Sequence, residues 1–425
     1  MVDIKPFRAI RYTAKAGTLK NLITQPYDKI NQDMQREYYE KSPYNYCRLI
    51  LPLEQNRYET VHQRLYEWLN EHIIAKDEEP AVFICRQDFR LDGRNCSRTG
   101  VIAALRLYAY GEGMVFPHET TYAAPKADRL NMLRNIQKDL EPVFLIYSDP
   151  DKTTLNVFAE IVKSPPTMEV EDEFRVMHKV WRVTDPENIA RLQDALEPKK
   201  LVITDGHHRY ESALEYRDER RKQVEWTKNS AFNFHMSYIV PVQDEGLVIL
   251  PTHRLLRKFE LTLETLEALA SFFEISELEP QVTAIECFLR ENKAEHAFCI
   301  YDGVKAYGLL LRDDSKISKL ADQKVSSAVS LLDVVILKDV VFKIMMKTGE
   351  LRIDEDIIYE RSMRVAMEKI ENGEAKLAFL VNPINPELVW EVAQKHERLP
   401  EKSTDFYPKP ASGLTMMDIS TEEKL

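Results

Sequence analysis

Residues 201–222 read LVITDGHHRYESALEYRDERRK, and this stretch decides how the chain is interpreted. The short, largely β-branched run Leu201–Ile203 predicts a strand, and Asp205-Gly206 behind it predicts a tight turn. From His207 to Arg217 the apolar and long side chains recur at helical spacing, which predicts a helix. The chain is therefore expected to run from a strand through a glycine turn directly into a helix.

Residues 205–209, called the cradle below, suit an anion. The start of a helix exposes unpaired backbone N–H groups, and the helix dipole adds about half a positive charge there. Gly206 lets the backbone approach an oxygen closely, and Arg209 offers a planar fork for phosphate. His207 and His208 can donate, accept or shuttle protons, so both are catalytic candidates, and His208 is also a phosphate-binding candidate. Asp205 can hold Mg²⁺, bind the nucleotide or orient a histidine.

A purely structural interpretation of the cradle stays open. Aspartate is a good helix N-cap, glycine forms turns in many settings, and His-Arg pairs occur on solvated faces. The functional interpretation is favoured because the polar group follows an apolar strand, where α/β proteins tend to present ligands.

Composition excludes several classes of protein. The 425 residues suffice for about two to three domains. A formal net charge of −11 argues against nucleic-acid binding, because an acidic surface repels phosphate backbones. The 12 glycines form none of the glycine motifs of Walker ATPases, Rossmann dehydrogenases or nucleophile-elbow hydrolases. The five cysteines have no C-x-x-C spacing, so neither a disulfide framework nor a structural zinc site is expected.

The chain shows no segment that would direct it into a membrane. No apolar run reaches about 18 residues, and the start lacks the apolar core of a signal peptide. We therefore expect a cytoplasmic protein without a membrane partner.

Two hairpins and three parts of the chain are predicted. Asp92-Gly93 and Asp302-Gly303 each lie between strand-like runs, which is a strong hairpin signal. The expected fold is α+β with a mixed sheet. Residues 1–250 form an α+β domain that carries the cradle, residues 251–413 form a smaller, helix-rich α/β domain, and residues 414–425 form a frayed tail.

His118, Glu119 and Lys126 are candidates outside the cradle. His118-Glu119 lies at the expected exit of a strand, where either residue can act as general base for a hydroxyl nucleophile. A loop pair bonded to nearby backbone is the alternative. Lys126 lies three residues before Arg129 on an expected helix, and the two can face a phosphate or simply solvent.

Asp28, Arg254 and Lys409 are weaker candidates. Asp28 can cap a helix near Asn31 or bind a metal ion. If Arg254 and Lys409 lie beside Arg209, the excess of positive charge fits a polyanion such as a nucleotide triphosphate. If they face solvent, that argument fails.

The stretch Asp205–Ala213 resembles the phosphate-binding box of the ParB/sulfiredoxin-like superfamily, in which a glycine, a polar residue and His-Arg or Arg-Arg open a helix. The chain as a whole resembles the DUF1015 family of uncharacterised bacterial and archaeal proteins. The blocks that carry this resemblance are Gln25-Pro26-Tyr27-Asp28, Ser42-Pro43-Tyr44-Asn45, His118-Glu119-Thr120, Pro125-Lys126 with Asp128-Arg129, Asp205 to Arg209, Thr252-His253-Arg254 and Phe406-Tyr407-Pro408-Lys409.

The superfamily resemblance implies nucleotide chemistry and a nucleotide-binding core with large insertions. Sulfiredoxins phosphorylate a sulfinate with ATP, ParB proteins bind and hydrolyse CTP, and an archaeal relative phosphorylates free serine. His207 stands where sulfiredoxins have their cysteine, which argues against sulfinate reduction. No helix-turn-helix pattern or basic surplus supports DNA binding.

The sequence therefore predicts a nucleotide-dependent phosphotransferase that acts on a small hydroxylated or amino-acid-like metabolite. Its expected cofactors are Mg²⁺ with ATP, ADP or CTP. Two alternatives stay open: a nucleotide-binding regulatory protein without turnover, and a nucleotide or phosphoester hydrolase.

Overall fold

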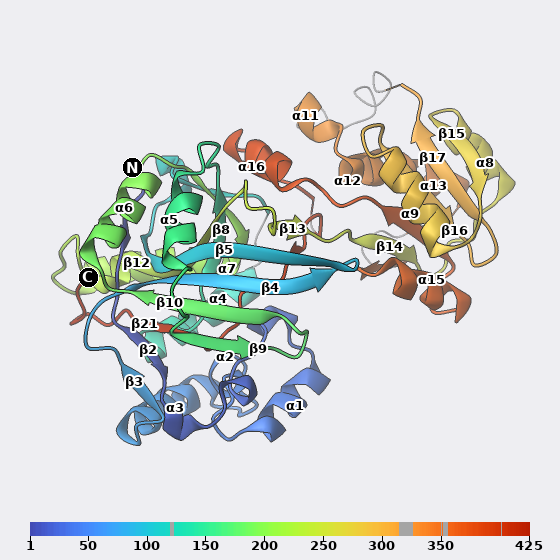
Figure 1. Cartoon of the computed structure of the whole chain (residues 1–425). Coiled ribbons are helices and arrows are strands. Elements are labelled where there is room, and N and C mark those ends of the chain that lie inside the picture. The colour runs from blue at the N-terminus through green and yellow to red at the C-terminus, as the bar shows by residue number, and fades with distance from the viewer. Residues whose placement is uncertain (120–122, 314–325, 350, 352–355, 401) are drawn as a thin grey trace. The chain divides into compact units, whose positions relative to one another are not determined.

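The computed structural model describes residues 1–119, 123–313, 326–349, 351, 356–400 and 402–425 (Figure 1). The chain divides into two compact units. Unit 1 comprises Met1–Val248 and Pro408–Leu425, and unit 2 comprises Ile249–Tyr407. The sequence places a boundary at residue 250 but does not anticipate that the chain returns to unit 1 at Pro408.

A large mixed sheet forms the centre of unit 1. β11 is parallel to β6 and antiparallel to β8, while β12 is parallel to β8 and antiparallel to β5. This mixed sheet, flanked by helices, confirms the predicted α+β class. In spatial order the strands are β6 (Val115–Pro117), β11 (Leu201–Asp205), β8 (Val143–Tyr147), β12 (Phe234–Pro241), β5 (Arg94–Arg106), β4 (Val82–Leu91), β10 (Met177–Val183) and β9 (Met168–Glu171), with β1 (Ile4–Lys5) beside β5.

Both predicted hairpins are confirmed. Asp92 and Gly93 join β4 to β5 with φ values of 48° and 77°, the left-handed conformation that a two-residue hairpin turn requires. Gly303, with φ 94°, lies in the turn between β16 and β17 of unit 2. Short-range turn chemistry therefore determines both strand pairs.

The helices of unit 1 include α4 and α7, which lie side by side (Figure 1). The Ser212 hydroxyl on α7 donates to the Lys126 carbonyl on α4 at 2.8 Å. The helices are α1 (Gln32–Lys41), α2 (Cys47–Ile50), α3 (Arg57–Asn70), α4 (Ala123–Ile136), α5 (Thr153–Ile161), α6 (Pro186–Leu196) and α7 (His207–Gln223), and the 3₁₀ turns are η1 (Ala14–Ala16), η2 (Leu19–Asn21), η3 (Tyr27–Lys29), η4 (Tyr110–Glu112) and η5 (Ala231–Asn233).

The C-terminal residues are ordered, so the predicted frayed tail at 414–425 is wrong. Met416 and Met417 are buried, and the carboxylate of Asp418 accepts from Lys76 and Lys138. These apolar and ionic contacts fix the segment as β21 in a second sheet of unit 1. Its order is β3 (Ile74–Lys76), β2 (Ala9–Tyr12), β21 (Met416–Asp418) and β7 (Lys138–Asp139).

Unit 2 is built on a sheet with a core on each face. Phe298 and Ile300 of β16 lie in one cluster of buried residues, and Cys299 lies in another. The sheet order is β15 (Phe273–Leu278), β17 (Ala306–Leu311), β16 (Ala297–Tyr301), β19 (Leu377–Val381), β14 (His253–Leu256) and β18 (Ile357–Glu360). A short ribbon pairs β13 (Val248–Ile249) with β20 (Phe406–Tyr407).

The helices of unit 2 are α8 (Leu263–Ala270), α9 (Val282–Glu291), α11 (Ser327–Ser330), α12 (Asp333–Ile336), η6 (Leu337–Val341), α13 (Phe342–Thr348), α15 (Met363–Glu371) and α16 (Pro386–Gln394). Within the described parts of both units, none of the helices combines the length and the apolar composition needed to cross a bilayer.

Candidate functional site

The cradle has the geometry that the sequence predicts. β11 ends at Asp205, Gly206 adopts a left-handed conformation with φ 89°, and α7 begins at His207. In other helices of unit 1, such as α1 and α6, the side chain of the N-cap residue accepts a hydrogen bond from a first-turn amide. Gly206 has no side chain to do this. The first-turn amides of α7 therefore lie at the end of a buried strand without an N-cap side chain over them.

A buried group of three charges lies beneath this turn. One Asp205 carboxylate oxygen lies 2.6 Å from Arg209 Nη2, and the other lies 2.8 Å from Lys409 Nζ. All three side chains are less than a tenth exposed. Burial alone would raise the pKa of Asp205, but the charges of Lys409 and Arg209 outweigh it and hold that pKa well below its usual range. The group carries two cations for one carboxylate.

Arg209 does not present a free fork to a phosphate, which corrects the prediction. Its Nη1 donates to the Pro142 carbonyl and its Nη2 to Asp205, so both ends of the fork are engaged. The described residues supply no hydrogen-bond partner for the buried Nε of Arg209. Arg209 therefore brings a positive charge to the start of α7 without a free fork.

His118 and Glu119 follow β6, the parallel neighbour of β11. Leu201 pairs with Val115 and Ile203 with Pro117, so both strands end at the same edge of the sheet. His118 Nδ1 donates to the Ile203 carbonyl at 2.6 Å, and its Nε2 lies 3.5 Å from Glu119 Oε1. His118 is fully buried, whereas the Glu119 side chain is 29% exposed. The Glu119 carboxylate is therefore the accessible member of the pair.

Glu119 is ionised over the ordinary pH range. Burial would raise its pKa, but the hydrogen bond and charge of His118, with smaller contributions from His207 and from the charge of Lys409, lower that pKa to about 2.

His207, a catalytic candidate from the sequence, lies in a buried position where it contacts backbone. It is buried, and its Nε2 accepts the backbone N–H of His118 at 3.3 Å. Burial is the largest cause that lowers the pKa of His207 to about 3, so the ring is neutral at ordinary pH. His207 holds the His118 segment against the start of α7.

This neutral histidine makes stability depend on pH. Between pH 6.5 and about 3 the unfolded chain binds a proton at His207 that the folded chain does not, so stability falls as pH falls through this window. We expect urea titrations from pH 6.5 to 4.5 to show a slope that is smaller in His207→Gln, by up to about 1.4 kcal/mol per pH unit. The matched control His62→Gln, at an exposed histidine, should keep the wild-type slope. Equal slopes in all three proteins would contradict a buried neutral His207.

His208 and Asp28 lie at the more exposed side of the cradle. His208 is partly exposed, and burial lowers its pKa while the charges of Glu211 and Asp28 raise it. Asp28 is exposed in η3. Next to it, the Tyr27 amide donates at 3.0 Å to buried Glu141, whose charge acts on Arg209. The sequence analysis does not single out Glu141 as a candidate site residue, and its only signal is its place just before the strand β8.

The metal prediction for Asp205 does not fit the structure. Both oxygens of Asp205 are paired with cations, and the described residues contain no group of three or more His, Cys, Asp or Glu side chains that could hold a metal ion. Mg²⁺ bound with a nucleotide needs only one or two carboxylates beside the phosphates. Asp28 is exposed, so its carboxylate is suited to help hold a nucleotide-bound Mg²⁺.

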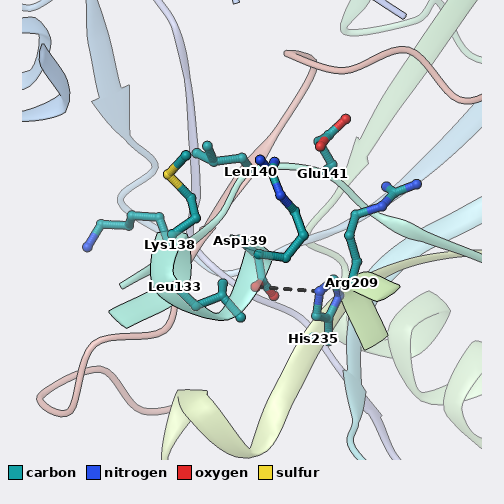
Figure 2. Close-up of a pocket in the computed structure, with 9 residues that line it drawn as sticks. Leu133, Lys138, Asp139, Leu140, Glu141, Arg209 and His235 are labelled. Carbon is teal, nitrogen blue, oxygen red and sulfur yellow. Dashed lines mark ion pairs between the residues drawn. The ribbon is translucent and has the colours of Figure 1, made fainter. Parts of the chain in front are cut away.

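A cavity of about 40 Å³ is lined in part by Arg209 (Figure 2). Asp139 and His235 face each other in it, with Asp139 Oδ1 3.6 Å from His235 Nε2. Glu141 also lines it. The cavity has room for about two or three water molecules, so it is too small for a nucleotide.

Two predicted phosphate ligands lie elsewhere. Lys126 pairs with Glu215 at 3.2 Å, in a groove between α4 and α7. Arg254 belongs to unit 2, where it is buried and donates to the Thr252 carbonyl, and the neighbouring His253 Nδ1 accepts from the Val381 amide. Lys409, whose position the sequence leaves open, lies at the cradle, with its Nζ 2.8 Å from Asp205 Oδ1. Thr120 lies outside the described residues.

Gly206 cannot be replaced without strain. A Cβ at this position would lie 3.0 Å from Arg209 Cζ and Nε, and the φ of 89° is unfavourable for any other residue. We expect Gly206→Ala to lower the free energy of unfolding by about 1–2 kcal/mol and to weaken nucleotide binding. The matched control Gly93→Ala has a similar φ, but no atom of the described part of the chain lies within 4 Å of its Cβ. It should therefore cost stability without affecting binding. Equal binding defects in the two variants would contradict a role of the cradle.

The chain belongs to the DUF1015 family, described as proteins of unknown function, whose model matches residues 4–335. The predicted family is thereby confirmed. Among curated proteins none matches this chain.

Three solved structures illustrate its distant likenesses. A conserved hypothetical protein from Pyrococcus furiosus has 15% identity and a TM-score of 0.32, covering 73% of this chain and 94% of that one. A free serine kinase in complex with AMP has 14% identity and a TM-score of 0.34, covering 73% and 90%. A C-terminally truncated SbnI from Staphylococcus aureus has 10% identity and a TM-score of 0.33, covering 72% and 84%. These values are too low to support a statement about function.

Proposed function

We propose that unit 1 is a nucleotide-dependent phosphotransferase that acts on a small hydroxylated or amino-acid-like metabolite. The observation that carries the proposal is the shared sheet edge of β6 and β11. It brings the His118–Glu119 pair and the Asp205–Arg209–Lys409 group together from distant parts of the sequence. Ligands of α/β sheets bind at the carboxyl ends of such strands.

The start of α7 is the proposed phosphate site. Its first-turn amides donate to phosphate oxygens, and Arg209 and Lys409 place two positive charges directly beneath them. His208, at the partly exposed side of the turn, stabilises the charge that develops on the transferred group. Asp205 holds the two cations in position.

Glu119 is the residue proposed to contact the substrate that accepts the phosphoryl group. Its ionised carboxylate accepts the proton of the substrate hydroxyl and orients that oxygen towards the phosphate. A strong base is not required, because phosphoryl transfer depends mainly on positioning and on charge stabilisation. His118, fixed through the Ile203 carbonyl, holds Glu119.

The proposed cofactors are Mg²⁺ and ATP, ADP or CTP. Mg²⁺ would be held by phosphate oxygens with Asp28, and it would neutralise charge on the nucleotide.

The test begins with calorimetric titration of ATP, ADP and CTP, each with Mg²⁺. Nucleotide labelled on its terminal phosphate, which is the γ-phosphate of ATP or CTP and the β-phosphate of ADP, is then incubated with pooled hydroxylated and amino-acid metabolites. We expect saturable binding and a labelled metabolite. Arg209→Ala should weaken binding at least about tenfold, whereas Arg191→Ala, at a surface pair on α6, should not. Release of free phosphate alone would favour a hydrolase, and binding alone would favour a regulatory protein. If none of the nucleotides binds, the proposal that the cradle is a phosphate site is refuted.

A further inference from the structure

A row of buried polar side chains crosses the large sheet of unit 1 and ends at the backbone of Lys409. His178 Nε2 donates to Asp172 Oδ2 at 3.0 Å, and His178 Nδ1 lies 3.5 Å from Gln87 Nε2. Gln87 Nε2 in turn donates to the Lys409 carbonyl at 2.9 Å. Gln87 and His178 are fully buried, on β4 and β10. The row therefore connects the interior of the sheet with the segment that carries the Lys409 ammonium.

Arg98 of β5 completes this row. Its guanidinium is fully buried over the ring of Phe144, with 4.7 Å between Cζ and the ring centroid. Nη2 of Arg98 donates to Gln87 Oε1 and to the Pro408 carbonyl. Two consecutive carbonyls, those of Pro408 and Lys409, are thus held by side chains of neighbouring strands.

The hydrogen-bond roles in the row are mutually consistent. Gln87 accepts from Arg98 through Oε1, so its amide group points at the Lys409 carbonyl and at His178 Nδ1. His178 is then the tautomer that carries its proton on Nε2, which suits its bond to Asp172. Gln87, His178 and Asp172 each have a buried hydrogen-bond partner in this network, so a shift of any of the three leaves a polar group unsatisfied.

We propose that Gln87 and Arg98 are positioning residues for Lys409. By fixing the Pro408 and Lys409 carbonyls, they keep the Lys409 ammonium on Asp205 and so set the charge beneath the first turn of α7. Only the expected effect on nucleotide affinity rests on the proposed function.

The titration of Asp205 separates positioning from a general contribution to stability. If Gln87 acts through Lys409, loss of Gln87 weakens the Asp205–Lys409 ion pair and raises the pKa of Asp205. A network that only stabilises the fold leaves this pKa unchanged in a variant that still folds.

The experiment follows the Asp205 signal by NMR of the full chain labelled with [¹³Cγ]aspartate, assigned with Asp205→Asn. We expect the pKa of Asp205 to rise in Lys409→Met and in Gln87→Met, and to rise no further in the double variant. Gln193→Met is the matched control, since Gln193 on α6 also donates to a backbone carbonyl, that of Ile4 at 2.8 Å. It should leave the Asp205 titration unchanged.

Arg98→Lys serves if Gln87→Met does not fold, because it keeps the charge but loses the planar fork. It should raise the pKa of Asp205 as well, and both variants should weaken ATP binding about tenfold. An Asp205 titration that moves in Lys409→Met but not in Gln87→Met or Arg98→Lys overturns the inference. Absence of nucleotide binding with the titration coupling intact would overturn the proposed function alone.

Discussion

Asp205→Asn is expected to lower the free energy of unfolding by about 3–5 kcal/mol, the cost of leaving buried charge without its partner. Asp205 is the carboxylate paired with both Arg209 and Lys409, and all three are buried. Asparagine keeps the shape but removes the negative charge that compensates two cations. Urea denaturation followed by tryptophan fluorescence measures the change.

The matched control for this variant is Asp33→Asn. Asp33 pairs with Arg36 on α1, where the two side chains are 87% and 69% exposed, so its replacement should leave stability unchanged. If the urea midpoint of Asp205→Asn equals that of the wild type, the buried charge group does not stabilise the cradle as described.

Glu119→Gln is expected to reduce phosphoryl transfer at least about 100-fold, the usual range for loss of a positioned acid–base group. Glutamine preserves the size of the side chain but cannot accept the hydroxyl proton. Nucleotide affinity should change less than about threefold, because the phosphates are bound at the start of α7. Initial rates with labelled nucleotide, together with calorimetric affinities, test both parts.

The pH dependence of the transfer rate is a second test of the role of Glu119. Because its pKa is lowered to about 2, the carboxylate stays ionised on acidification from pH 7 to 5, and no loss of rate in this range should arise from it. Glu160→Gln, at an exposed ion pair with Arg191, is the control and should keep full activity. A Glu119→Gln enzyme of normal rate would remove Glu119 from the chemistry.

The local part of the fold could be predicted because it depends on nearest neighbours. The turn residues Asp92-Gly93 and Gly206 have the positive φ values that their chemistry favours. The strands and the helix that flank these turns are predicted by the spacing of their hydrophobic residues. The same patterns carry no information on which distant strand lies next to β11. The parallel pairing with β6, which gathers the site, is visible only in three dimensions.

The site could be predicted only in outline for the same reason. Nothing near Lys409 indicates that it will reach Asp205, and nothing near Arg209 indicates that Pro142 will occupy part of its fork. The sequence predicts a frayed tail because the polar end of the chain dominates the pattern there. In the structure, Met416 and Met417 fill the space beside β2 and β7.

The most direct test of the account is a crystal structure of the full chain grown with Mg²⁺ and a non-hydrolysable ATP analogue. The account predicts phosphate oxygens within hydrogen-bond distance of the first-turn amides of His207, His208 and Arg209, with the terminal phosphate facing Glu119. An analogue bound elsewhere on the chain, with no phosphate oxygen near those amides, would contradict it.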